Sequence, residues 1–491
     1  MLSHDEMRAV PVNSHCILFN RFIGFFWFFP WLSVVLTHHA TGLQQHLAPR
    51  FFQRNGGQVQ YGQFAMTSPA LAVAKPKVGR FRWIICALLF FATLINYMDR
   101  HIIGILKPEL KQTFQWSEQD YGTMVASFQA AYAAGLALSG PFIEWVGMKS
   151  AYAIAIILWS LATIFHAPAR SVFGFIAART ALGLGESANW PAAIRTVTEW
   201  FPQRERSVAT GLFNTGSNVG PILGPLVLPW LAWQFSWQTA FIVLGVFGFV
   251  WLLFWLWLYD VPEKSRRLKP AELAFIQGDA SEPKTEKIAW NHLFRHRETW
   301  AYVVAGVFTA PVWWFYLFWL PDFFHKQFRL NLREFGLPLV AVYTVTAFGS
   351  IAGGELSAWF LGRGWSLNWS RKVAALVCAA SAVPVIFATR THHVWLAASF
   401  FALAGAANQG WSATMFTVVS DIFPRRAVAS VVGIGGMFSS IVSVGFSWAV
   451  GSILENTGVY DTILLVCGSA YLVTWVMFHL IIPEIRPIEI K

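Results

Sequence analysis

Twelve apolar segments, each close to the length that crosses a bilayer, set the strongest limit on what this 491-residue chain can fold into. A transmembrane helix needs about 20 consecutive apolar residues, because each residue advances the helix by about 1.5 Å through a hydrocarbon core of about 30 Å. Since 56% of the residues are hydrophobic and 12% are charged, we predict an all-α membrane protein with twelve transmembrane helices. The predicted spans are 81–103, 121–143, 148–167, 170–194, 205–231, 236–259, 299–321, 337–361, 370–390, 393–419, 427–451 and 459–482.

The formal net charge of +11 reflects membrane topology. The Lys and Arg residues fall in alternate loops and do not gather on one polar face, so the sequence does not indicate nucleic-acid binding. Basic residues mark the cytoplasmic loops of membrane proteins. With an even number of spans, we predict a multi-pass protein of the inner membrane, in contact with lipid, whose two termini both lie in the cytoplasm.

The twelve spans divide into two similar halves. Residues 260–298 form the longest charged stretch and are predicted to be a cytoplasmic linker between six-helix bundles at 81–259 and 299–482, with a cytoplasmic tail at 483–491. The sequence WFPQRERSVATGLF after the fourth span matches IFPRRAVASVVGIG after the tenth. Such a duplication is typical of transporters whose binding site lies between two pseudo-symmetric bundles.

Residues 1–80 do not fit the twelve-span plan. The segment 17–36 is apolar and nearly long enough to span, but Asn20, Arg21 and Pro30 interrupt it. We expect residues 1–80 to be a dispensable leader, with Met66 as an alternative start. A thirteenth span and a signal peptide are the other interpretations.

Four charged residues lie inside predicted spans. Asp99 and Arg100 end the first long apolar segment, and Arg179 and Glu186 lie seven residues apart in the fourth. A charge near the bilayer centre costs about 2.5 to 3.5 kcal/mol on the translocon scale, so such residues normally face a polar cavity and serve a function. Seven residues place Arg179 and Glu186 on one helix face but about 10.5 Å apart, too far for a simple ion pair. We predict a transport site built from these charges.

The chemistry of these four residues fits an anion and a proton. A carboxylate in a water-poor site changes its protonation state readily when a guanidinium approaches or leaves. Arginine stays charged and holds a carboxylate with two parallel hydrogen bonds. Adjacent helical residues point about 100° apart, so Asp99 and Arg100 must face different neighbours. The alternative is a permanent ion-pair network that only fixes the first span to the fourth.

The loop sequence GPFIEWVGMKSAY, between the second and third spans, resembles the conformational latch of the major facilitator superfamily. Gly140, Glu144, Gly147 and Lys149 fit the gating pattern of that loop, whereas Trp145 stands where the family usually has a base. The resemblance implies the two-bundle major facilitator fold and transport by alternating access.

A narrower resemblance is carried by NYMDR, YGTMVASFQAAYAAG, ARTALGLGESANWPAAIRTVTEWFPQRERSVATGLFNTGSNVG and RGWSLNWSRK. These segments are similar to the anion:cation symporter family, especially its hexuronate-transporter branch. The resemblance implies proton-coupled uptake of sugar acids across the inner membrane. It also implies that Asp99 and Glu186 exchange protons and that their cationic partners, Arg100 and Arg179, bind the carboxylate of the substrate.

Polar and aromatic side chains at mid-span depth are candidates for contact with the substrate, since sugar hydroxyls need hydrogen-bond partners and sugar rings stack on aromatic rings. For each of them the alternative is hydrogen bonding between helices or simple packing. The resemblance favours Tyr132 and Asn408 as cavity residues. The full set is Tyr97, Gln129, Tyr132, Asn189, Asn214, Asn218, Tyr316, Asn408, Gln409 and Trp411.

We therefore predict a monomeric symporter that imports a hexuronate, such as glucuronate or galacturonate, with a proton. The alternatives are transport or exchange of another small organic anion, such as galactonate or glucarate, and a transporter-derived membrane sensor. No activated nucleophile is evident, so the sequence does not predict an enzyme. Cysteine and histidine residues lack the spacing of metal ligands, so we expect neither a metal site nor a cofactor.

Overall fold

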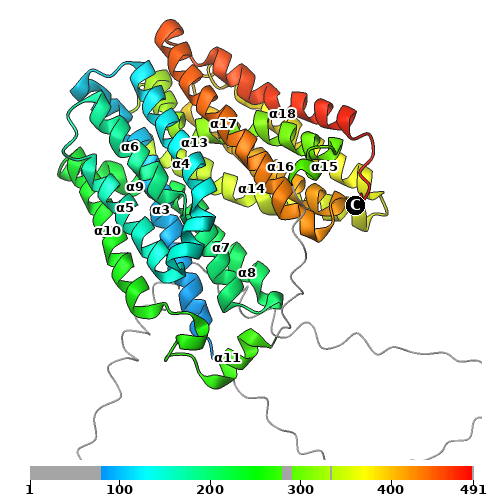
Figure 1. Ribbon diagram of the computed structural model, residues 1–491. Coiled ribbons are helices and arrows are strands. Elements are labelled where there is room, and N and C mark those ends of the chain that lie inside the picture. Colours follow the sequence, from blue (N-terminus) through cyan, green and yellow to red (C-terminus); the bar gives the residue numbers. More distant parts are fainter. Residues whose placement is uncertain (1–78, 279–289, 332–333, 489–491) are drawn as a thin grey trace, which may run out of the picture. The chain divides into compact units, whose positions relative to one another are not determined.

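The structure, a computed structural model, describes residues 79–278, 290–331 and 334–488, and the regular secondary structure within these ranges is entirely helical (Figure 1). These residues belong to one unit, Lys75–Lys491. The expectation that residues 1–80 form a leader concerns a segment that, up to residue 78, lies outside the described residues. The all-α prediction is confirmed.

Eight helices form the first half of the described chain. They are α3 (Phe81–Phe114), α4 (Glu118–Val146), α5 (Met148–Phe165), α6 (Val172–Glu186), α7 (Asn189–Trp200), α8 (Gln203–Asn214), α9 (Gly216–Gln234) and α10 (Trp237–Leu258). Three short helices follow in the connection between the halves, namely η1 (Pro262–Lys264), α11 (Pro270–Gln277) and α12 (Trp290–Leu293).

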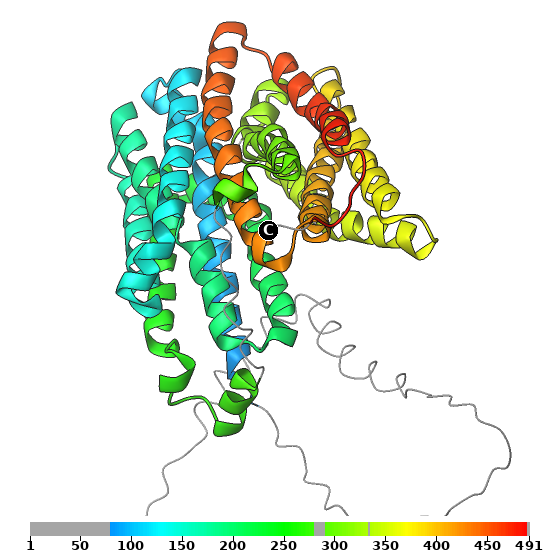
Figure 2. The same cartoon turned by 45° about the vertical axis from the view of Figure 1, so that its right-hand side comes forward.

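The second half is built in the same way from long helices. They are α13 (Arg297–Phe328), α14 (Gly336–Gly362), α15 (Leu367–Ala382), the short η2 (Val383–Phe387), α16 (Val394–Ile422), α17 (Arg425–Thr457) and α18 (Asp461–Ile481). Figures 1 and 2 show the helices of the first half, blue to green, gathered in one group and those of the second half, yellow-green to red, in another.

Within the described ranges, eight helices are long and apolar enough to cross a membrane. The other predicted spans coincide with α4, with α16, and with two pairs of shorter helices, α6–α7 and α8–α9. The number of spans therefore stays at twelve as a prediction. Some boundaries differ from those predicted, since α3 continues to Phe114, beyond the predicted end at residue 103. The last turns of α3, which lead into the loop before α4, are more polar than a bilayer core favours.

The break between α6 and α7 has a cause in the sequence. Proline at position 191 has no backbone N–H, and its ring clashes with the carbonyl group four residues earlier, which belongs to Ser187. The helix accordingly ends at Glu186 and restarts at Asn189. This interruption places the Glu186 carboxylate at the end of a helix, inside a predicted span.

Glycine lets α6 approach α4 closely enough to build the charged centre. A Cβ atom at Gly183 would lie 2.4 Å from the backbone oxygen of Phe128 in α4, which is far inside van der Waals contact. Any larger residue at Gly183 would push the two helices apart. The sequence LGLGE therefore serves packing as well as carrying Glu186.

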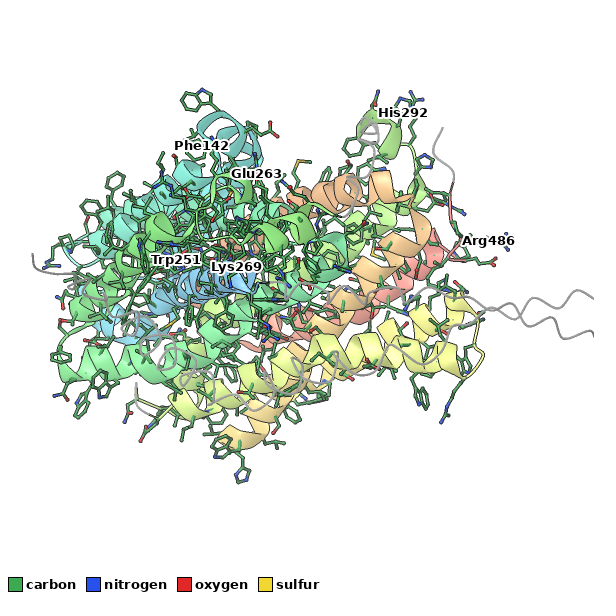
Figure 3. All side chains as sticks on the ribbon, turned by 90° about the horizontal axis from the view of Figure 1, so that it is seen from below. Phe142, Trp251, Glu263, Lys269, His292 and Arg486 are labelled. Carbon is green, nitrogen blue, oxygen red and sulfur yellow. The ribbon has the colours of Figure 1, made fainter. Side chains whose placement is uncertain are left out.

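The connection between the halves is fixed to the first half by Glu272 in α11. Its carboxylate accepts the backbone N–H groups of Phe81 and Arg82, at 3.2 Å each, and lies 3.0 Å from the Arg82 guanidinium. The first turn of α3 is thereby capped by an anion, which suits the positive end of a helix. Figure 3 views the molecule from below and shows Glu263 and Lys269 of this connection over first-half helices.

The two halves pack against each other along α4 and α17. A Cβ atom at Gly122 would lie 2.9 Å from the Cα atom of Gly451, so the two backbones cross at these glycines. A little farther along α4, the Ser447 hydroxyl of α17 donates a hydrogen bond of 2.9 Å to the side-chain oxygen of Gln129. This close crossing sets the separation of the halves on one side of the site.

Candidate functional site

The centre of the first half is a buried ion pair between α3 and α6. The Arg100 Nε atom lies 2.6 Å from the Glu186 carboxylate, and both side chains are almost completely enclosed. Of the two adjacent charges on α3, it is therefore Arg100 that meets the fourth predicted span. The prediction that Asp99 and Arg100 face different neighbours agrees with this geometry.

Aromatic rings surround the Arg100 guanidinium. Its central carbon lies 4.5 Å from the ring centre of Tyr132 and 4.8 Å from that of Tyr97, with Phe128 and Trp314 each at 5.7 Å. Faces of aromatic rings attract cations. Trp314 comes from α13, so the cage is assembled from both halves. The guanidinium thus sits at the junction of the two bundles.

The second arginine, Arg179, contacts backbone rather than carboxylate. Its guanidinium donates to the carbonyl groups of Asp99 and Arg100 at 3.4 and 3.3 Å, and it lies 4.7 Å from the ring centre of Phe128. Among the residues that the structure describes, no carboxylate lies within ion-pair distance of Arg179. The predicted separation of Arg179 from Glu186 agrees with this arrangement.

The Asp99 carboxyl group makes its hydrogen bond to α5. One of its carboxylate oxygens accepts a 2.9 Å hydrogen bond from the Thr163 hydroxyl, and the whole residue is buried. Its other oxygen, Oδ2, has no hydrogen-bond partner in the described part of the chain. Thr163 was not among the predicted site residues, because a threonine in an apolar helix carries no signal of its own.

The other candidates on the first half lie on several helices. Asn189 accepts a 2.6 Å hydrogen bond from the Tyr152 hydroxyl, which fits the alternative of a contact between helices. Asn214 lies at the exposed end of α8 and accepts from Ser217, and Asn218 is half-buried in α9. The amide group of Gln129 keeps its NH2 free of partners among the described residues.

The candidates on the second half gather around Tyr471 and Tyr316. Asn408 donates to the Tyr471 hydroxyl at 2.5 Å, and Trp411 packs edge-on against the same ring, with 5.8 Å between ring centres. Tyr316 is buried, and its hydroxyl finds no partner within the described ranges. Gln409 is half-buried on the same helix, α16.

The latch-like loop lies at the junction of α4 and α5. Gly147, whose φ of 86° favours glycine, ends α4, and Lys149 forms a 2.7 Å ion pair with Asp260 at the end of α10. Gly140 and Glu144 are exposed. Lys149 lies in α5 and Asp260 lies just after α10, so this pair fixes two helices of the first bundle to each other.

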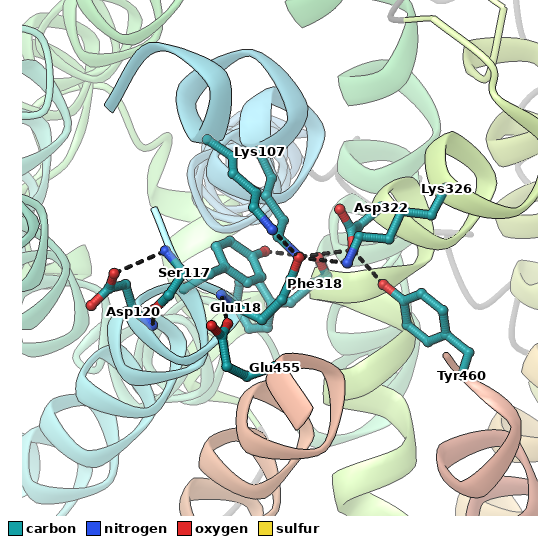
Figure 4. A network of polar contacts seen from close by, with 11 residues as sticks. Lys107, Ser117, Glu118, Asp120, Phe318, Asp322, Lys326, Glu455 and Tyr460 are labelled. Atoms are coloured by element: carbon teal, nitrogen blue, oxygen red, sulfur yellow. Dashed lines mark hydrogen bonds and ion pairs between the residues drawn. The ribbon is translucent and has the colours of Figure 1, made fainter. Parts of the chain in front are cut away.

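A second set of charges lies where α3 and α13 end and α4 begins (Figure 4). Lys107 lies 2.8 Å from Asp322 in the second half and 2.6 Å from Glu118 in the first. Lys326 in the second half reaches Glu118 at 2.5 Å and Asp322 at 3.4 Å. With Lys111, which also pairs with Glu118, we call these five residues the interhalf charge cluster.

Further contacts close the same end of the molecule. The Glu455 carboxylate accepts the backbone N–H of Glu118, and the Tyr121 hydroxyl donates to the backbone oxygen of Phe318 at 2.8 Å. The Tyr460 hydroxyl donates to Asp322. In the described part of the chain, hydrogen bonds and ion pairs between the halves occur here and at Gln129. The halves are therefore joined at this end.

The sequence comparisons agree with this architecture. The sequence profile of the Major Facilitator Superfamily matches residues 89–447. The chain belongs to this superfamily. It is a membrane transporter with several membrane-spanning helices and not an enzyme, as the sequence predicted.

Two curated relatives of this major facilitator are named as transporters of sugar acids. The hexuronate transporter of Escherichia coli strain K12 is 30% identical over 390 residues, which cover 78% of this chain and 90% of the relative. The galacturonate transporter of Dickeya chrysanthemi is 32% identical over 290 residues, or 58% of this chain and 84% of the relative.

Solved structures show the same fold. A crystal structure of a D-xylose–proton symporter aligns with a TM-score of 0.65 at 17% identity, over 82% of this chain and 99% of that one. The predicted major facilitator fold is thus confirmed.

Proposed function

We propose that the protein imports a hexuronate, such as glucuronate or galacturonate, together with at least one proton, by alternating access. The observation that carries the proposal is the placement of Arg100, 2.6 Å from Glu186 and enclosed by aromatic rings from both halves. A cation at the junction of two bundles is where a carboxylate substrate would be held. The names of the Escherichia coli and Dickeya relatives support the substrate class.

In this proposal, Glu186 and the substrate compete for Arg100. The carboxylate of a hexuronate is the same chemical group as the Glu186 side chain. Protonation of Glu186 removes its charge and weakens its hold on Arg100, which stays charged and turns its two-pronged guanidinium toward the substrate. Loss of the proton inside the cell restores the Arg100–Glu186 pair and expels the anion.

The aromatic cage supplies contacts for the sugar ring. Tyr97 and Tyr132 present their faces to the guanidinium from α3 and α4, and Trp314 does so from α13. A sugar whose carboxylate binds Arg100 would lie beside these rings and stack on one of them. The free amide NH2 of Gln129 offers a donor for a sugar oxygen.

The remaining assignments extend this site. Asn408, Tyr316, Gln409 and Trp411 are proposed to bind the sugar from the second half, and Asn189, Asn214 and Asn218 from the first. Gly140, Glu144, Gly147 and Lys149 are proposed to form the gating loop. The support for these roles is the predicted depth of the residues together with the open hydrogen-bonding capacity of Tyr316.

The proposed topology places both termini in the cytoplasm of a bacterial cell and the bundles at 81–259 and 299–482. The interhalf charge cluster would then face the periplasm. Because this cluster joins the halves, the described state would be closed to the periplasm and would release substrate inward.

Uptake into proteoliposomes tests the function. Labelled glucuronate and galacturonate should accumulate when the outside is made acidic, and unlabelled galactonate or glucarate should compete poorly. Accumulation of galactonate or glucarate in their place would reassign the substrate. Equal uptake with and without a pH gradient would refute proton coupling.

A further inference from the structure

Many buried hydroxyl groups on the described helices bond to their own helix. Within a helix, a Ser or Thr hydroxyl can donate to the carbonyl group three or four residues earlier. Buried threonines that donate to the residue four positions before them are Thr93, Thr309, Thr414 and Thr474, with distances of 2.6 to 2.9 Å.

Thr163, like Ser447 of α17, instead bonds to a side chain of another helix. It is completely buried in α5, and its hydroxyl donates at 2.9 Å to Asp99 Oδ1 on α3. The other Asp99 oxygen, Oδ2, has no partner among the described residues. A carboxylate held on one oxygen and open on the other has a defined place for a proton.

The charged groups around Asp99 form no hydrogen bond with its Oδ2 atom among the described residues. From α6, Arg179 binds the backbone oxygen of Asp99 rather than its side chain, while Glu186 is engaged by Arg100. His166, which directly follows α5, directs its Nδ1 atom to the backbone oxygen of Ala162. Thr163 is thus the side chain that fixes the direction of the Asp99 carboxyl group.

We propose that Thr163 is a positioning residue for Asp99, which it holds toward α5 as a proton site separate from the anion site at Arg100 and Glu186. This inference rests on the proposed proton-coupled function. The neutral hydroxyl orients the carboxyl group without neutralising it. The proton can therefore enter and leave Asp99 while Arg100 exchanges Glu186 for substrate.

The isosteric variant Thr163→Val tests the proposal, because it keeps the shape and removes the donor. A hydrogen bond from a donor favours the charged form of a carboxylate, so its loss lets Asp99 bind a proton at higher pH. The pH at which uptake is half-maximal should rise by about one unit, a tenfold change in proton affinity. Substrate affinity in counterflow at equal pH should stay unchanged. Thr163→Ser, which keeps the hydroxyl, should restore the original profile.

A matched control and a second variant separate the outcomes. Thr474→Val removes an equally buried hydroxyl that serves only its own helix, and its pH profile should equal that of the natural protein. If Thr163→Val does not reach the membrane, Thr163→Ala should give the same pH shift.

An unchanged profile in the Thr163 variants, beside pH-driven uptake by the natural protein, would overturn the positioning role alone. A shift in Thr474→Val as large as that in Thr163→Val would also overturn it. Absence of pH-driven uptake in the natural protein would instead overturn the proposed function.

Discussion

Replacing Asp322 by Asn should open the end of the molecule that the interhalf charge cluster closes. Asp322 lies in the second half, and its carboxylate is almost fully enclosed between Lys107 at 2.8 Å and Lys326 at 3.4 Å. Asparagine has nearly the same size and still accepts from Tyr460, so the change removes the negative charge and little else.

The expected change in free energy depends on the ion pairs that each lysine keeps after the substitution. Removing one partner of a buried ion pair costs about 3 to 5 kcal/mol when it leaves the other charge alone. Here both lysines keep Glu118, at 2.6 and 2.5 Å, so the lower figure is taken as the upper limit of the cost. A loss of about 3 kcal/mol shifts the balance between closed and open states about 100-fold. An open state populated at about 1% would rise to about half.

Pulsed electron paramagnetic resonance can measure this shift. Spin labels at Thr113→Cys in α3 and Asn456→Cys in α17 would report the separation of the halves, since both positions are exposed near the cluster. Cys86, Cys378 and Cys467 are buried and should label slowly, and Cys16 would be replaced by Ser. The Asp322→Asn protein should show a second, longer distance.

Asp461→Asn is the matched control. Asp461 begins α18 beside Tyr460, is exposed and accepts the Thr389 hydroxyl, but has no contact with the cluster among the described residues. An Asp322→Asn distribution that stays as narrow as that of the natural protein would refute the reasoning. So would an equal change in Asp461→Asn.

Three further predictions concern the site and its packing. Glu186→Gln should abolish uptake driven by a pH gradient but preserve counterflow at equal pH, because the amide resembles the neutral acid; loss of both would assign Glu186 to binding or folding. Arg100→Lys should weaken substrate binding about tenfold, ~1.4 kcal/mol, because lysine lacks the two-pronged geometry, and an unchanged affinity in a titration would contradict this. Gly183→Val should destabilise the protein by about 1 to 3 kcal/mol in thermal melts, whereas Gly211→Ala, with open space around it, should not; equal melting temperatures would show that α6 can shift.

The helical fold and the family were predictable because the signals are long and repeated. Apolar runs of span length and a duplicated junction remain recognisable even where single residues depart from the pattern. Hydropathy did not predict the helix break near Pro191, since the apolar run continues through the interruption. Helix ends were also less predictable, because the polar last turns of α3 continue the helix beyond the apolar run.

The charged residues of the site were predictable because each one is costly in a membrane, but their partners were not. The sequence indicated that Asp99 and Arg100 diverge, yet the neighbour of Asp99, Thr163, is inconspicuous in a run of apolar residues. Trp314 is one of 26 tryptophans, and only its distance to Arg100 distinguishes it from packing residues. The interhalf charge cluster was also missed, because its members lie near the ends of predicted spans where charges are common.

The adjacency of Asp99 and Arg100 has a mechanical consequence. Neighbouring residues on a helix share one backbone segment but point about 100° apart, so α3 presents an anion to α5 and a cation to α6 within a single step. Any displacement of α3 against α5 and α6 therefore changes both contacts at once. Because Lys107 lies two turns farther along the same helix, α3 also carries a member of the interhalf charge cluster. The proposed proton site, the proposed anion site and the interhalf charge cluster are thus joined through one helix, which is how the proposed function would couple these events.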